Sequence, residues 1–172
     1  MNRVLRSLEI AANIGIVVVA IVLSVAVGRR GLIGPANARP TRSTLRAGEE
    51  FRVPGIAWPK NKPTLSLALS ASCHFCAEGA PFYRRLVSRA REVGVEVVAL
   101  MPQEPSAARR YLDAQLLPVT VVHRMSATDG IAAFPTVLIV GPNGIVQDLW
   151  TGKLDQGQED IVMARVGSLM SK

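Results

Sequence analysis

The sequence predicts an α/β domain in which a mixed β-sheet is flanked by helices, preceded by one N-terminal transmembrane helix. Apolar runs of strand length recur between residues 63 and 150, and segments with helical apolar spacing separate the first of them. The last two runs are joined by the turn signal Gly141-Pro142-Asn143-Gly144, which favours an antiparallel hairpin. A much longer apolar segment lies near the N-terminus and has the length of a bilayer span.

The elements follow from the apolar period. Strands are expected at 63–70, 95–101, 119–123, 134–140 and 145–150. Helices are expected at 77–93, 104–115 and 156–169, and Pro105 suits the first turn of the second. The apolar stripe expected on the last helix consists of Ile161, Val162, Ala164, Val166 and Leu169.

The only two cysteines, Cys73 and Cys76, are spaced by about one helical turn at the strand-to-helix junction. At a helix start the first thiol faces free N–H groups that favour its thiolate, and the second can close a disulfide with it. This arrangement indicates a reversible redox pair. A half zinc site and an inert structural disulfide are the alternatives. Zinc needs about four ligands, and only His74 and His123 add to the cysteines, whereas so short a disulfide loop stabilises little.

Residues 48–172 resemble the membrane-anchored thiol-disulfide oxidoreductases of the TlpA/ResA type, which are related to the redoxins and have a thioredoxin fold. The segment at 104–123 matches the extra helix and strand of that branch, and 48–55 resembles its short first strand. The motifs that carry the resemblance are Cys73-His74-Phe75-Cys76, Pro81, Phe134-Pro135-Thr136 and Gly141-Pro142-Asn143-Gly144-Ile145.

The resemblance implies a role for each motif. Cys73 attacks a substrate disulfide and Cys76 resolves the mixed disulfide. Pro81 bends the active-site helix. Phe134 and Pro135 are joined by a cis bond, face Cys73 and bind the substrate peptide. Protein disulfides and dithiols are the expected substrates, and no metal or other cofactor is expected.

The chain also departs from the family pattern. Ser72 stands where the family has Trp, and no acid occurs in 63–72, although thioredoxins keep a buried acid near that level. We assign no such role to Glu78. His74 is a candidate catalytic residue because its imidazole can stabilise a Cys73 thiolate. With the acid missing, these features predict a pair less reducing than thioredoxin's.

Two further functional classes use the same residues. A copper-binding carrier resembling the Sco-type proteins would use Cys73, Cys76 and a histidine such as His123, but Sco-type cysteines are more widely spaced. A redoxin-type peroxidase would need a Thr-x-x-Cys motif, where this chain has Ser70 three residues before Cys73.

The N-terminal segment divides the chain into three expected parts: a membrane anchor at 1–28, a basic juxtamembrane linker at 29–47 and the redox domain at 48–172. Residues 10–27 are almost wholly apolar. A cleaved signal peptide is the alternative, since Ala36-Asn37-Ala38 has the pattern of a cleavage site. Arg29 and Arg30 lie between that site and the apolar run, which favours an uncleaved anchor.

Charge is unevenly distributed. The chain carries a net charge of +7, and residues 1–62 hold all of it, with ten Lys and Arg against three acids; residues 63–172 contain ten of each. A balanced domain gives no support for nucleic-acid binding. The arginines flanking the apolar segment lean toward a cytoplasmic domain, whereas disulfide substrates are abundant outside the cytosol. We therefore expect a single-pass inner-membrane protein with a periplasmic domain, serviced by a membrane electron donor.

Overall fold

The computed structural model describes residues 45–126 and 129–169. The predicted anchor and most of the predicted linker lie outside these ranges, so their boundaries stay predictions. Within the described ranges, no helix is both long and apolar enough to cross a bilayer.

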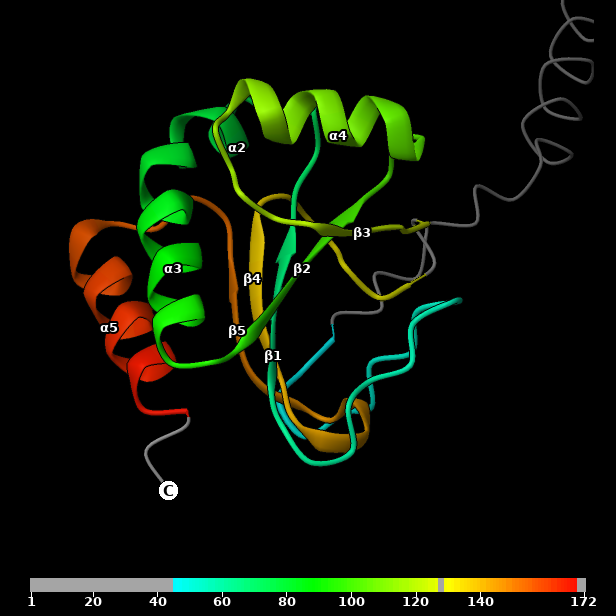
Figure 1. Cartoon of the computed structure of the whole chain (residues 1–172), viewed down its shortest axis with the longest axis vertical. Helices are drawn as coiled ribbons and strands as arrows, with labels where there is room; N and C mark the ends of the chain where they lie inside the picture. Colours follow the sequence, from blue (N-terminus) through cyan, green and yellow to red (C-terminus); the bar gives the residue numbers. More distant parts are fainter. Residues whose placement is uncertain (1–44, 127–128, 170–172) are drawn as a thin grey trace, which may run out of the picture. The chain divides into compact units, whose positions relative to one another are not determined.

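Five strands form one sheet in the order β3-β2-β1-β4-β5 (Figure 1). β1 pairs in parallel with β2, and β2 with β3, while β4 pairs antiparallel with both β1 and β5. The mixed α/β sheet that the sequence predicts is therefore confirmed. The elements are β1 (Thr64–Ala68), α2 (His74–Glu78), α3 (Ala80–Glu92), β2 (Glu96–Met101), α4 (Pro105–Ala114), β3 (Val121–Arg124), β4 (Thr136–Val140), a 3-10 turn (Pro142–Gly144), β5 (Val146–Thr151) and α5 (Gln156–Gly167).

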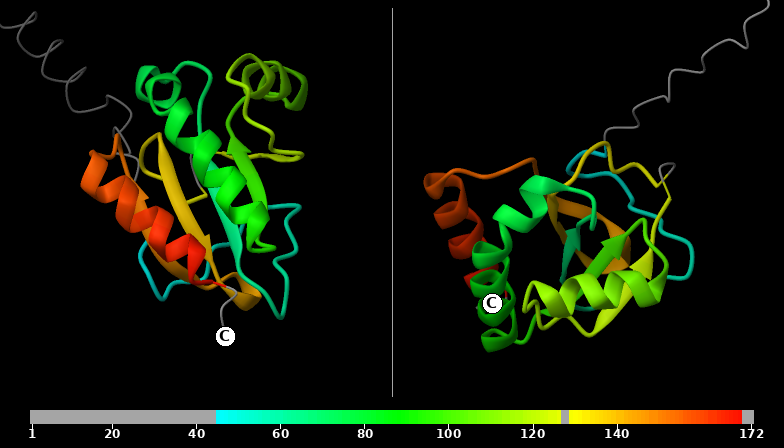
Figure 2. Two further views of the ribbon diagram at one scale, coloured as in Figure 1. Left: turned by 60° about the vertical axis from the view of Figure 1, so that its left-hand side comes forward. Right: turned by 90° about the horizontal axis from the view of Figure 1, so that it is seen from above.

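The three longer helices share one apolar core on one face of the sheet. Leu86 of α3, Leu112 of α4 and Val166 of α5 belong to the same buried cluster as Leu67 at the centre of β1. For α3, which connects β1 to β2, and α4, which connects β2 to β3, this is the expected arrangement. Two successive right-handed crossovers that advance in the same direction place their helices on the same face. In Figures 1 and 2, α3 and α5 run side by side, and the ion pair between Arg85 and Glu159 joins them at 2.7 Å.

The opposite face of the sheet is covered by irregular chain. Phe51 and Val53 come from the segment before β1, and Met125 and Ile131 come from the connection before β4; all four are buried against this face. The indole N–H of Trp58 donates a 2.6 Å hydrogen bond to the carbonyl of Phe51, which secures the first of these segments. The central strands β1, β2 and β4 thus bury both faces, which explains why their sequences are mostly apolar.

The helix expected at 77–93 is interrupted. α2 ends at Glu78, Gly79 caps it, and α3 begins at Ala80 with Pro81 in its first turn. A proline there loses no intrahelical hydrogen bond, so the break falls where the residue is tolerated. The bend expected at Pro81 corresponds to this break between α2 and α3.

Three local expectations were wrong. The strand predicted at 119–123 begins at Val121, because the Arg109 guanidinium binds the carbonyls of Val119 and Thr120. The short first strand expected at 48–55 is reduced to one bridge between Glu50 and Ile145. Of the apolar stripe expected on the last helix, Val162 and Val166 are buried and Leu169 is partly buried against the same core. The members found on the surface are Ile161 and Ala164.

Gly79 offers a test of the helix break. A Cβ at Gly79 would lie 2.7 Å from the hydroxyl oxygen and 2.8 Å from ring carbons of Tyr83, which is buried. We expect Gly79→Ala to lower the free energy of unfolding by about 1–3 kcal/mol, because a buried ring must move. Gly157→Ala in α5 is the control: it meets only Asp155 at 3.5 Å and should be neutral or stabilising by about 0.5–1 kcal/mol. Equal effects in urea denaturation would contradict this packing.

Candidate active site

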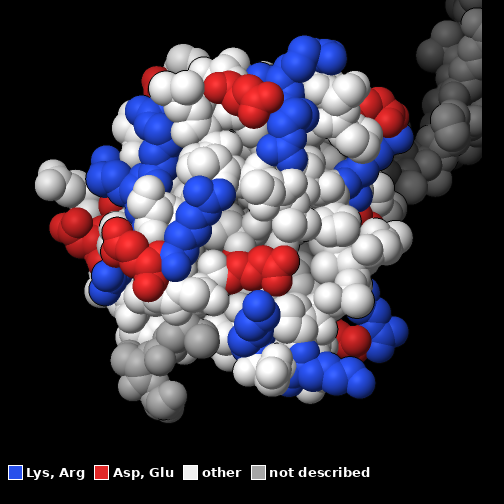
Figure 3. Space-filling view, viewed as in Figure 1, with Lys and Arg blue, Asp and Glu red and all other residues white. Residues whose placement is uncertain are grey.

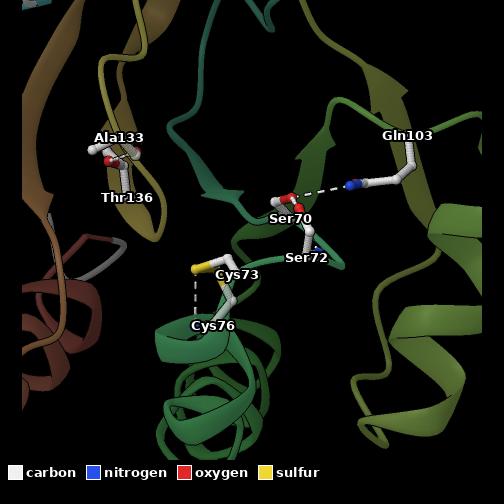
Figure 4. The surroundings of a disulfide bond; sticks show 7 residues. All are labelled: Ser70, Ser72, Cys73, Cys76, Gln103, Ala133 and Thr136. Carbon is white, nitrogen blue, oxygen red and sulfur yellow. Dashed lines mark hydrogen bonds between the residues drawn. A yellow bond between two sulfur atoms is a disulfide. The ribbon is translucent and has the colours of Figure 1, made fainter.

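Cys73 and Cys76 form a disulfide at the end of the loop that follows β1 (Figure 4). Cys73 is the N-cap of α2, and its Sγ accepts a 3.2 Å hydrogen bond from the backbone N–H of Cys76. Cys76 is fully buried in the helix-side core, whereas Cys73 is only half-buried. The pair is therefore asymmetric: Cys73 is partly exposed and its sulfur already faces a donor that favours its thiolate, whereas Cys76 is shielded.

A chain of hydroxyl groups fixes the turn before Cys73. The Ser70 carbonyl accepts from the Cys73 N–H at 3.1 Å, and Ser70 Oγ lies 3.0 Å from Ser72 Oγ. Gln103 reaches over from the β2–α4 loop and donates from Nε2 to Ser70 Oγ at 3.0 Å (Figure 4). This network supports the backbone that presents Cys73. No sequence pattern indicated Gln103, because the contact spans 33 residues.

The peptide bond between Phe134 and Pro135 is cis, which confirms the prediction. Thr136 Oγ1 donates to the carbonyl of Ala133 at 2.8 Å and closes this turn (Figure 4). Gly152 donates from its N–H to the carbonyl of Pro135 at 2.7 Å. Because Ala68 pairs with Thr136, the chain leaving β1 toward Cys73 and the chain entering β4 through Pro135 lie at the same edge of the sheet.

His74 has a partner other than the cysteines. Its Nε2 lies 2.9 Å from Oε1 of Glu78, one turn further along α2, and Oε2 of the same carboxylate accepts from Lys153 Nζ at 2.7 Å. The Lys153 ammonium, with a smaller contribution from His74, holds the pKa of the Glu78 carboxyl below its ordinary value. The spacing of four residues between His74 and Glu78 is a signal that the sequence contained, whereas Lys153 had none.

The buried surroundings of Cys76 contain no acid within the described ranges. Leu65, Leu67 and Leu69 supply the apolar side of β1 in the cluster that holds Cys76. The only polar side chains buried in the described residues are Thr64, Ser66, Ser70 and Thr136. On the face shown in Figure 3, acidic and basic side chains are interspersed.

His123 lies away from the cysteines. It is on edge strand β3 and lines a pocket with Val98 and Val121, two residues of the face opposite the cysteine pair. Cys73 and Cys76 pack into the helix-side cluster instead. Among residues 45–126 and 129–169, no cluster of three or more His, Cys, Asp or Glu side chains is placed to hold a metal ion. The geometry therefore does not bring His123 to the cysteines, as a copper carrier using that residue would require.

Solved structures share this architecture. The chain is 15 % identical to a candidate thiol:disulfide interchange protein DsbE of Chlorobium tepidum, with a TM-score of 0.57 over 74 % of this chain and 99 % of the other. For the thioredoxin domain of a thiol-disulfide oxidoreductase of Bacteroides vulgatus, the identity is 15 %, the TM-score 0.52 and the coverage 69 % and 99 %. A thiol:disulfide interchange protein from Bacteroides sp. is 14 % identical, with a TM-score of 0.54 over 71 % of this chain and 91 % of the other.

No family model matches the sequence, and no curated protein matches it. At identities of 14–15 % the likeness is one of fold. The thioredoxin fold that the sequence resemblance implied is therefore confirmed, and the chain shares it with thiol:disulfide interchange proteins.

The asymmetry of the cysteines has a chemical consequence. In the reduced protein we expect iodoacetamide to modify Cys73 first, at least tenfold faster than Cys76, because Cys76 is fully buried and Cys73 Sγ faces an N–H donor. Mass spectrometry of peptides after timed alkylation, between about pH 5 and 9, gives both rates. Faster modification of Cys76 at any of these pH values would contradict the assignment.

Proposed function

We propose that this protein is a thiol-disulfide oxidoreductase that exchanges disulfides with protein substrates through Cys73 and Cys76. The observation that carries the proposal is the asymmetric disulfide at the N-cap of α2, on the edge of a thioredoxin fold where the chain enters the cis-Pro135 turn. A structural disulfide does not need an accessible sulfur, whereas an exchange reaction needs one sulfur that a partner can reach.

The chemistry follows from this asymmetry. The Cys73 thiolate attacks one sulfur of a substrate disulfide; a bond between Cys73 and that sulfur forms as the substrate S–S bond breaks. The other substrate sulfur leaves as a thiolate and takes a proton from water. The Cys76 thiolate then attacks Cys73 Sγ, re-forms the internal disulfide and releases the second substrate sulfur. That sulfur also leaves as a thiolate and takes a proton from water, and the two enzyme thiols released the same number of protons to water when they ionised, so two electrons and two protons have passed to the substrate.

The backbone N–H of Cys76 and the side chains of Phe134 and Pro135 support these steps by where they lie. The Cys76 N–H, 3.2 Å from Cys73 Sγ, can stabilise the negative charge of the Cys73 thiolate that begins the reaction. Phe134 is half-buried and packs against both core clusters, so it presents a fixed apolar edge beside Pro135. We assign Phe134 and Pro135 to the binding of the substrate peptide.

The direction that we propose is reduction. It rests on the resemblance to the TlpA/ResA type, and it requires a donor of two electrons to reopen the Cys73–Cys76 disulfide after each cycle. A membrane electron donor would supply them. The anchor proposed at 10–27 would hold the domain on the membrane surface near such a donor, and we propose the periplasmic side of the inner membrane because substrate disulfides form there.

Removal of one cysteine tests the proposed reaction. We expect Cys76→Ser to accumulate mixed disulfides with cell-envelope proteins, because nothing then resolves the bond at Cys73. Cys73→Ser should accumulate few, since the remaining sulfur is fully buried. Non-reducing gels of thiol-quenched cells measure both, with the double serine variant as the control. Equal trapping by both single variants, or none by either, would contradict the proposal.

Topology requires a separate experiment. We expect a C-terminal alkaline-phosphatase fusion to the full chain to be active, because that enzyme folds only where its disulfides can form. A fluorescent-protein fusion at the same position is the matched control and should stay dark if the domain is exported. An inactive phosphatase with a bright control would place the domain in the cytoplasm, as the arginines flanking 10–27 would favour.

A further inference from the structure

Three polar side chains, which we call the His74–Glu78–Lys153 group, are linked to one another on the surface of α2, the helix that Cys73 caps, and the exchange reaction described above does not use them. His74 Nε2 is 2.9 Å from Glu78 Oε1, and Lys153 Nζ is 2.7 Å from Glu78 Oε2. Each carboxylate oxygen thus has its own partner. His74 follows Cys73 directly in the sequence, so the orientation of its ring and the charge around it bear on the reactive sulfur.

Lys153 comes from the other part of the active site. It directly follows Gly152, whose N–H donates to the carbonyl of Pro135 at 2.7 Å. The ion pair between Lys153 and Glu78 therefore ties α2, which carries Cys76, to the segment that holds the cis-proline turn. It spans 75 residues of sequence.

The charge of this group is close enough to influence the thiolate. Cys73 caps α2 and Glu78 is its last residue, so the two are separated along the helix axis by about 7.5 Å, a distance of the order of the Debye length of about 8 Å at physiological salt. The carboxyl is ionised at neutral pH, as an ordinary Glu carboxyl is, and the ammonium of Lys153 lowers its pKa further. With a neutral imidazole, the negative charge of Glu78 and the positive charge of Lys153 cancel. The three linked side chains then exert no net charge on Cys73.

We propose that Glu78 and Lys153 are positioning residues that set the redox poise of the cysteine pair: Glu78 holds the His74 imidazole, and Lys153 cancels the carboxylate charge that would otherwise oppose the Cys73 thiolate. The inference rests on the proposed function and adds the residues that tune it. A thiolate stabilised in the reduced state makes the disulfide a better oxidant, and a thiolate destabilised there makes the dithiol a better reductant.

The test is the equilibrium of the full-length protein with reduced and oxidised glutathione. Glu78→Gln leaves the positive charge of Lys153 unbalanced, which favours the Cys73 thiolate and should shift the equilibrium about two- to fivefold toward the dithiol. The effect is modest because these charges are exposed. Lys153→Met leaves the negative charge of Glu78 unbalanced, which opposes the Cys73 thiolate and should shift the equilibrium by a similar factor toward the disulfide. A threefold change corresponds to about 14 mV for this two-electron couple. The double variant, again uncharged apart from His74, should return to within about twofold of wild type.

The signs separate electrostatic control from a purely mechanical tie. Loss of a mechanical tie would move both single variants in the same direction and leave the double variant displaced, and that result would overturn the proposal. The Arg85–Glu159 pair, also 2.7 Å long but between α3 and α5, is the matched control. Arg85→Met and Glu159→Gln should leave the equilibrium unchanged, and shifts equal to those at Glu78 and Lys153 would also overturn it.

This readout does not depend on any protein substrate. If substrate trapping fails while the glutathione equilibria shift in opposite directions, the proposed function is wrong and the electrostatic control stands. If trapping succeeds and the equilibria do not move, the proposed function stands and the control is refuted.

Discussion

The antiparallel pairing of β4 with β1 is the constraint on which the site depends. Its register sets Ala68 opposite Thr136, so the chain that leaves β1 and the chain that enters β4 meet at one edge of the sheet. Cys73 lies beyond the first of these strand ends and Pro135 immediately before the second. A slip of one residue would turn the alternate apolar side chains of a strand to the wrong face. Because both faces of β1 are buried, the core that stabilises the domain also fixes the geometry of the site.

The same core makes the two cysteines different. Cys76 faces inward from α2 into the cluster shared by α3, α4 and α5, while Cys73 stays at the cap, where the turn from Ser70 presents it. The break at Gly79 allows α2 to be oriented independently of α3, which packs along the sheet. The division of labour between the two sulfurs is thus a result of packing and does not require a special residue at either position.

Much of this arrangement could be predicted from the sequence, since it is encoded locally. The strands and α3 are marked by their apolar periods, the hairpin by its Asn143-Gly144 turn, and the redox pair by its spacing. The long-range contacts around the site could not be predicted, because they join distant segments. Gln103 reaches Ser70 from the β2–α4 loop, and Lys153 reaches Glu78 from the loop before α5. The start of β3 was misjudged for a similar reason: Arg109 occupies the carbonyls of Val119 and Thr120, which the apolar pattern assigned to the sheet.

The central claim, that Cys73 and Cys76 form a redox pair in reversible exchange, is tested most directly by the reduction potential of the wild-type protein. No acid is buried among residues 45–126 and 129–169, so none there opposes a thiolate from the core, and Lys153 balances the charge of Glu78. We therefore expect equilibration with glutathione to give about −180 to −230 mV, less reducing than the roughly −270 mV of thioredoxin. A disulfide that stays closed below about −300 mV would be a structural one, and that result would contradict the account.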